Sequence, residues 1–168
     1  MMINRTAIVV VCVICAVSSH FFAGMATQTK EIPADLMKEL NTALKSETPR
    51  YEQINEPFLY YRVSAGKVFY LVFSQQAGTS AAGYGGPVHL ALLLNESGGL
   101  QEFFVVAHQE TPAFFSMLKK SSFWQQLREY SPGDDIAAVT GATLTSSALK
   151  QGVAKTIARF RDRVLNGK

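Results

Sequence analysis

Apolar residues along this chain follow two different spacings, which divide it into predicted helices and strands. Two stretches have the 3.6-residue spacing of an amphipathic helix. The first covers residues 32–44 and ends before Pro49, and the second begins near Thr145 and continues to about residue 165. The apolar stripe of the second stretch consists of Leu149, Val153, Ile157, Phe160 and Val164. A helix is therefore expected near each end of the folded part of the chain.

Between these helices the apolar residues form short runs rich in aromatic and β-branched side chains, as is typical of strands. The runs come in two pairs, each joined by a short turn, which indicates two hairpins. Hairpins flanked by helices predict an α+β fold around an antiparallel sheet. The paired runs are 58–63 with 68–74 and 88–94 with 100–107, short helical pieces are expected at 114–118 and 123–127, and a last short strand at 136–139.

The N-terminal segment, residues 1–26, differs from the rest of the chain. Residues 7–26 contain no charged side chain, and Arg5 precedes them. This pattern predicts either a signal peptide, cleaved after Gly24-Met25-Ala26, or a transmembrane anchor. In both cases the positive N-terminus stays in the cytoplasm, and the domain that follows, residues 27–168, is exported.

Composition narrows the possible functions. Apolar residues make up 48% of the chain and charged residues 17%, which is typical of a globular protein, and the net charge is +3. No basic block is interleaved with aromatic residues, so nucleic-acid binding is not expected. Cys12 and Cys15 both lie in the N-terminal segment. The exported domain therefore has no disulfide, no cysteine-ligated metal and no cysteine nucleophile.

The segment between the last predicted strand and the last predicted helix is rich in hydroxyl groups. It reads Thr140-Gly141-Ala142-Thr143-Leu144-Thr145-Ser146-Ser147. A helix start has unpaired backbone N–H groups and the positive end of the helix dipole, and so it suits a phosphate. Gly141 and Ala142 let the backbone approach a ligand closely. The alternative interpretation is a helix N-cap with additional Ser and Thr residues.

Two further segments contain residue types that are common in binding sites. Gly83-Tyr84-Gly85-Gly86-Pro87 directly precedes a predicted strand. It therefore matches neither a dinucleotide-binding fingerprint nor a P-loop, and by itself it fits a flexible connector. The other segment, His108-Gln109-Glu110-Thr111-Pro112, follows the next strand.

Two other types of site are weaker alternatives. The scattered residues His89, His108, Glu110, Asp134 and Asp135 lack the ligand spacing of a metal site. A hydrolase triad of Ser146 or Ser147 with His108 and Asp135 is a further alternative. The Gly-x-Ser-x-Gly segment of the common serine hydrolases is not present.

Together and in this order, residues 83–87, 108–112 and 140–146 resemble the FMN-binding domain family. This family includes the peripheral flavoprotein subunits of the Rnf and Nqr membrane electron-transfer complexes. The resemblance covers about residues 58–165, and an apolar anchor before an exported domain is similar to the family as well. The joint occurrence of the three segments is more specific than any one of them.

The resemblance implies a cofactor and its attachment point. In this family a flavin transferase attaches FMN through its phosphate to the last Thr of a Ser/Thr-Gly-Ala-Thr motif. The matching residue here is Thr143. The resemblance also implies contacts from Thr140, Gly141, Ala142, Thr145 and Ser146 around the phosphate, from the backbone of Gly85 and Gly86, and from Glu110, Thr111 and Pro112 on the ring side.

Two positions differ from the family pattern. Ala137, three residues before Thr140, stands where the family often has Asp. Ala113-Phe114-Phe115 follows Pro112 where the family usually has Gly-Leu-Gly, and these two aromatic rings offer a stacking surface.

The sequence thus predicts an FMN-carrying electron-transfer protein of the inner membrane, with its domain on the periplasmic side. Its expected partners are the membrane, a flavin transferase and redox proteins of an electron-transfer complex. No residue is expected to act as a catalyst. The alternatives are a non-covalent FMN-binding or sensory module without an electron-transfer role, and a small exported hydrolase.

Overall fold

The structure is a computed structural model that describes residues 31–46 and 48–167. Contacts within the chain separate residues 1–31 from residues 32–168, and every element below belongs to the second part. The predicted N-terminal segment, residues 1–26, and the boundary after it lie outside the described residues. None of the helices described is both long and apolar enough to cross a membrane.

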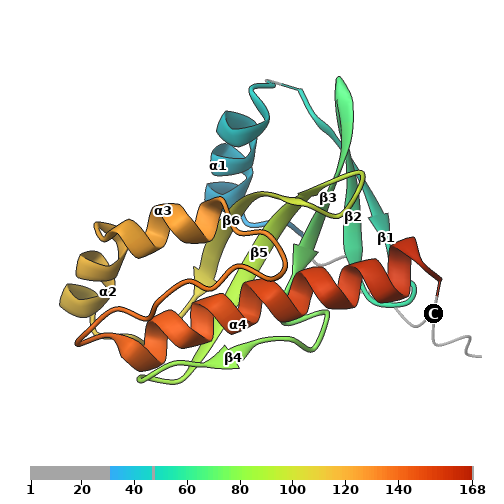
Figure 1. Cartoon of the computed structure of the whole chain (residues 1–168). Helices are drawn as coiled ribbons and strands as arrows, with labels where there is room; N and C mark the ends of the chain where they lie inside the picture. The colour runs from blue at the N-terminus through green and yellow to red at the C-terminus, as the bar shows by residue number, and fades with distance from the viewer. Residues whose placement is uncertain (1–30, 47, 168) are drawn as a thin grey trace, which may run out of the picture. The chain divides into compact units, whose positions relative to one another are not determined.

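The described residues form a mixed α+β domain, as predicted (Figure 1). Its strands follow one another between an N-terminal helix and the C-terminal helices, as expected for hairpins flanked by helices. In chain order they are α1 (Ala34–Leu44), β1 (Arg50–Ile54), β2 (Tyr60–Ala65), β3 (Lys67–Phe73), β4 (Ala81–Ala82), β5 (Pro87–Asn95), β6 (Leu100–Ala107), α2 (Pro112–Lys119), α3 (Ser122–Arg128), α4 (Thr143–Phe160) and the π-helical turn η1 (Arg161–Leu165).

The strands form one antiparallel sheet with β5 at its centre. β2 pairs with β1 and β3, and β5 pairs with β3 and β6. Both predicted hairpins, β2–β3 and β5–β6, are confirmed. In the turn between β5 and β6 the Asn95 side chain accepts hydrogen bonds from the N–H groups of Ser97 and Gly99, a common way to close a tight turn.

Helices cover both faces of this sheet (Figure 1). Alternate residues of a strand point to opposite faces. Leu90, Leu92 and Leu94 of β5 therefore pack towards α3 and α4, and Ala91 and Leu93 pack towards α1. Because β5 is covered on both sides, it reads as a continuous apolar run and not as an alternating one.

The two amphipathic helices lie where their patterns predict. α1 buries Leu36 and Leu40 against one face of the sheet. α4 buries Leu149, Val153 and Ile157, together with Phe160, against the other face. Burying each of these side chains contributes about 1.5 to 3 kcal/mol. α4 is thereby fixed along its length, and its first turn lies beside Glu110, which follows β6.

Three details of the strand prediction are wrong. Residues 50–54 form strand β1, which the sequence did not indicate because this edge strand is largely polar. Between the two predicted hairpins, where no strand was predicted, residues 81–82 form the short strand β4. Residues 136–139, predicted as a strand, form none. Groups of α4 bond this segment instead, because Lys150 Nζ donates to the Ile136 carbonyl and Ser146 Oγ accepts from the Val139 N–H.

The ion pair beside this segment gives a pH prediction. A hydrogen bond from the Lys150 ammonium at 2.9 Å, and its charge, lower the pKa of the Asp135 carboxyl below its usual 3.8. A lowered pKa stabilises the fold above the unfolded value, and this contribution is lost as the pH falls through the folded value. The free energy of unfolding of Asp135→Asn should therefore be slightly below wild type at neutral pH, and the gap should close below pH 3.8.

Urea titrations at several pH values measure this gap. Asp162→Asn, an exposed change in η1, should match wild type throughout. A gap for Asp135→Asn that stays constant down to about pH 2 would show that the ion pair is not its cause.

Candidate functional site

A cavity of about 360 Å³ lies between the start of α4, the start of α2 and the glycine-rich loop before β5. It brings together all three segments singled out in the sequence, although they are far apart along the chain. Its lining residues are Tyr84, Glu110, Phe114, Phe115 and the consecutive residues Gly141, Ala142, Thr143, Leu144 and Thr145.

The Glu110 carboxylate joins the three segments. Its side chain is only 6% exposed. One oxygen, Oε1, accepts a hydrogen bond from the Gly85 N–H at 3.1 Å, and the other, Oε2, accepts one from the Thr145 hydroxyl at 2.7 Å. Hydrogen bonds to a charged group contribute more than neutral ones. Glu110 therefore holds the glycine loop and the first turn of α4 on either side of the cavity.

The glycine loop lies directly against this carboxylate. A Cβ at Gly83 would overlap Glu110 Oε1, and one at Gly85 would overlap the carbonyl oxygen of Gln109. The loop is closed by a hydrogen bond of 2.8 Å from the Gly83 N–H to the Gly86 carbonyl. Glycine is required at position 85 because backbone packs on backbone there. The loop is therefore a fitted part of the site, whereas a flexible connector would tolerate side chains.

His108 supports Glu110 and the aromatic wall from behind. The Glu110 N–H donates to His108 Nδ1 at 3.1 Å, which requires that Nδ1 carries no proton. The imidazole also stacks on Phe115, with ring centroids 3.8 Å apart. His108 thus positions Glu110, which bonds the glycine loop, and Phe115, which lines the cavity.

The first turn of α4 presents free donors to the cavity. Its N-cap residue, Ala142, makes no side-chain cap. No described residue accepts a hydrogen bond from the backbone N–H of Thr143, Leu144 or Thr145. The first backbone hydrogen bond of the helix runs from the Ser146 N–H to the Ala142 carbonyl, at 2.9 Å. Three free N–H groups at the positive end of an 18-residue helix favour an anionic ligand.

The hydroxyl groups of this turn have different roles. Those of Thr145 and Ser146 are buried and bonded, to Glu110 and to the Ala142 carbonyl respectively. Thr143 is exposed and lines the cavity, and its hydroxyl makes only a long hydrogen bond of 3.3 Å, to the Val139 carbonyl. Thr143 therefore carries the hydroxyl of this turn that is available for reaction inside the cavity.

Comparison with known proteins shows which family the residues of this site match. Residues 83–158 match the family model described as an FMN-binding domain. This match begins at the glycine loop and continues into α4, so it contains all three segments. Residues 83–158 belong to the FMN-binding domain family. The cofactor indicated for this domain is therefore FMN.

A curated relative agrees with this assignment. It is a subunit of the proton-translocating ferredoxin:NAD(+) oxidoreductase complex of Clostridium ljungdahlii, and it is 24% identical over 160 residues. The alignment covers 85% of this chain and 84% of the relative. The similarity thus extends well beyond residues 83–158.

The described residues fit FMN. Ligand pockets are typically about 300–1,000 Å³, and this cavity falls within that range. The free amides at the start of α4 suit a phosphate, and Tyr84, Phe114 and Phe115 offer aromatic surface to a flavin ring. Thr143 would hold the phosphate end.

Not every residue implied by the resemblance lines the cavity. The lining does not include Thr140, Gly86, Thr111 or Pro112, and their contacts with a flavin stay predictions. Gly85 and Ser146 shape it through the hydrogen bonds described above. Two lining residues were missed, Tyr84 and Leu144, which are 77% and 59% exposed. A signal existed for Leu144, because this large apolar residue lies off the buried stripe of α4.

The structure does not assemble the hydrolase triad. Ser146 Oγ bonds backbone groups, His108 Nδ1 accepts from the Glu110 N–H, and Asp135 pairs with Lys150. Ser147 has no hydrogen bond to His108 or Asp135 in the described part of the chain.

Within the described residues no group of His, Asp and Glu has the arrangement of a metal site.

Removing the Glu110 carboxylate tests its role in holding the FMN-binding domain together. Glu110→Ala leaves the Gly85 N–H and the Thr145 hydroxyl without their acceptor. The free energy of unfolding, measured by urea titration, should fall by about 2 to 3 kcal/mol. Glu96→Ala, an exposed change in the β5–β6 turn, should stay within about 0.5 kcal/mol of wild type. Equal stability of the two variants would contradict the role given to Glu110.

Proposed function

We propose that this protein is a membrane-anchored FMN carrier that passes electrons between redox proteins on the periplasmic side of the inner membrane. Its FMN is attached by a phosphoester to Thr143. The observation that carries this proposal is the first turn of α4, where an exposed hydroxyl and three free backbone amides line one cavity. The relative from C. ljungdahlii is a subunit of an oxidoreductase complex, which supports the electron-transfer role.

The attachment requires one hydroxyl and one anion site. The bond joins Thr143 Oγ1 to the phosphorus of FMN. It forms when the flavin transferase lets this oxygen displace the leaving group of an activated FMN donor, such as a phosphoanhydride, and the hydroxyl proton is released. The product differs from free Thr143 and free FMN by one water. The positive end of α4 stabilises the negative phosphate beside it. The hydroxyls of Thr145 and Ser146 are buried and bonded, and Thr140 is outside the cavity lining, so Thr143 is the acceptor.

The aromatic residues of the cavity suit the flavin ring. Glu110 also lines the cavity, where its carboxylate bonds the buried Thr145 hydroxyl. Because a carboxylate repels a phosphate, the phosphate is expected at the exposed Thr143 and not at Thr145. Tyr84 and Phe114 are exposed on the rim, and Phe115 is held beneath by His108. These residues orient the ring.

The cofactor supplies the chemistry. Bound FMN provides reversible electron acceptance, and the chain provides the tether, the orientation and the local electrostatics.

The rival function is a module that binds FMN without a covalent bond and senses or stores it. The observation that favours this rival is Ala137, which stands where the family often has Asp, because a transferase that recognises this Asp would not modify the chain.

One production experiment distinguishes the two functions. The full chain is produced with and without a flavin transferase in an exporting host, and the membrane fraction is denatured and separated by electrophoresis. We expect a band that fluoresces under ultraviolet light only when the transferase is present. Flavin released on denaturation in both cases would support the rival, and no flavin in either case would overturn both functions.

The same fractions test the anchor. The full chain should sediment with membranes, and a chain beginning at Thr27 should be soluble. A mature N-terminus at Thr27, with the protein free in the periplasm, would replace the anchor with a cleaved signal peptide.

A further inference from the structure

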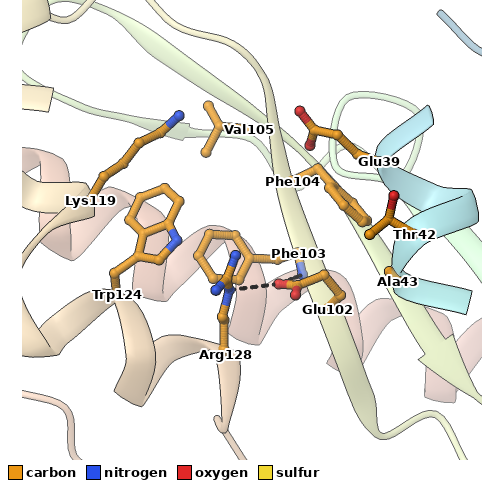
Figure 2. A pocket seen from close by; sticks show the side chains of 10 residues that line it. All are labelled: Glu39, Thr42, Ala43, Glu102, Phe103, Phe104, Val105, Lys119, Trp124 and Arg128. Carbon is orange, nitrogen blue, oxygen red and sulfur yellow. Dashed lines mark hydrogen bonds and ion pairs between the residues drawn. The ribbon is translucent and has the colours of Figure 1, made fainter. Parts of the chain in front are cut away.

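A second cavity, of about 560 Å³, lies along the open edge of β6 and shares no residue with the FMN site. Among the described strands β6 pairs only with β5, so its other edge faces this cavity. Figure 2 shows β6 running between side chains of α1 on one side and of α2 and α3 on the other. We call this cavity the β6 groove. It has the form of a slot with an unpaired strand edge as its floor.

Glu102 closes this edge in the free molecule (Figure 2). The Phe103 N–H donates to Glu102 Oε1 at 3.0 Å instead of to β5, so it points to the open edge. The same oxygen accepts a hydrogen bond from Arg128 Nε, also at 3.0 Å. Glu102 thus occupies the position that a carbonyl oxygen of a neighbouring strand would take. Charged residues on an edge strand commonly block such pairing.

The walls of the groove carry opposite charges. Glu39 lies on the α1 wall and Lys119 on the α2 wall, and neither forms an ion pair with any other residue in the described part of the chain. The Lys119 ammonium lies over the Trp124 ring, 5.7 Å from its centroid. Arg128 on α3 forms its ion pair with Glu102. The α2–α3 wall is therefore basic and aromatic, and it suits an acidic side chain.

We propose that the β6 groove binds an extended, acidic segment of a partner protein, which adds to the sheet as a strand and displaces Glu102. An added strand bonds through its backbone and points alternate side chains to opposite walls. Its acidic side chains would face Lys119 and Arg128, and polar or basic ones would face Glu39. The Glu102 carboxylate already makes this kind of contact, since it bonds a strand N–H and Arg128 at once.

The test uses two blocked peptides as long as β6, which has eight residues. They alternate threonine with either glutamate or lysine and are otherwise identical. Trp124 is the single tryptophan of the chain and lines the groove, so its emission reports occupancy. Hydrogen exchange at the Phe103 amide reports pairing with the edge. Both readouts are made on the full chain without flavin, so the result is independent of the FMN proposal.

We expect the glutamate peptide to bind and to protect the Phe103 amide. Glu102→Ala should bind it about tenfold more tightly, because the internal competitor is removed. Lys119→Ala should weaken binding about two- to fivefold. The matched control Lys120→Ala, one residue later and outside the groove, should leave binding unchanged.

Three results would overturn the proposal. The lysine peptide could bind as tightly as the glutamate peptide, or neither peptide could bind Glu102→Ala. Alternatively, Glu102→Ala could dimerise and not bind the acidic peptide. The role of Glu102 would then be only to prevent self-association.

Discussion

Thr143→Val should fold like the wild type and carry no covalent flavin when it is produced together with a flavin transferase. Valine keeps the β-branched shape and nearly the volume of threonine but has no hydroxyl to form the phosphoester. The lost hydrogen bond is long, 3.3 Å, and lies at an exposed position, so the free energy of unfolding should change by less than about 0.5 kcal/mol. Flavin fluorescence of the denatured band and a melting curve measure the two effects.

Two variants of the same turn serve as controls. Thr140→Ser keeps a hydroxyl at the first position of the motif, where the family has either Ser or Thr, and it should keep the covalent flavin. Thr145→Val should keep it too, but with lower stability, because the Thr145 hydroxyl is buried against Glu110. Covalent flavin in Thr143→Val would show that the acceptor is another residue.

Gly85→Val should have the largest effect on the fold of the site. Its Cβ would overlap the Gln109 carbonyl oxygen and lie 3.1 Å from the Glu110 nitrogen. Both atoms belong to the backbone, so no flexible side chain can move aside. The loop must separate from residues 109–110 and lose the bond between the Gly85 N–H and Glu110. We expect the free energy of unfolding to fall by about 2 kcal/mol or more, with loss of bound flavin.

Gly86→Val and Ala82→Val provide a graded comparison. At Gly86, φ is +142° and the nearest atom is the end of the flexible Gln109 side chain. A smaller loss, about 1 kcal/mol, is therefore expected there. Ala82 is exposed in β4, and its substitution should be nearly neutral. Wild-type stability and flavin content in Gly85→Val would reduce the loop to a connector.

The sequence predicts the elements whose pattern is set by burial. The apolar run 88–94 becomes the central strand, and the stripe from Leu149 to Phe160 packs on it. Prediction from the sequence fails where the rest of the fold decides which groups a segment's backbone bonds. Residues 136–139 have a strand-like composition, yet side chains of α4 satisfy their backbone groups. β1 is a strand because β2 pairs with it, and its own mostly polar residues do not have the apolar pattern that predicts a strand.

The site shows the same division. Resemblance to the family picks out Thr143 and Glu110 from local segments. The role of Glu110 depends on contacts with Gly85, 25 residues before it, and Thr145, 35 residues after it. No spacing rule predicts such contacts. They explain why the three segments occur together, because one carboxylate binds the other two.

The most direct test of the proposed attachment is mass spectrometry of the peptide that contains Thr143. The full chain is produced with a flavin transferase, purified from membranes, denatured, digested and fragmented. The proposal predicts a mass increase equal to FMN minus water, assigned by the fragments to Thr143. The same increase on Thr140, Thr145 or another residue, or an unmodified peptide from protein that releases its flavin on denaturation, would contradict it.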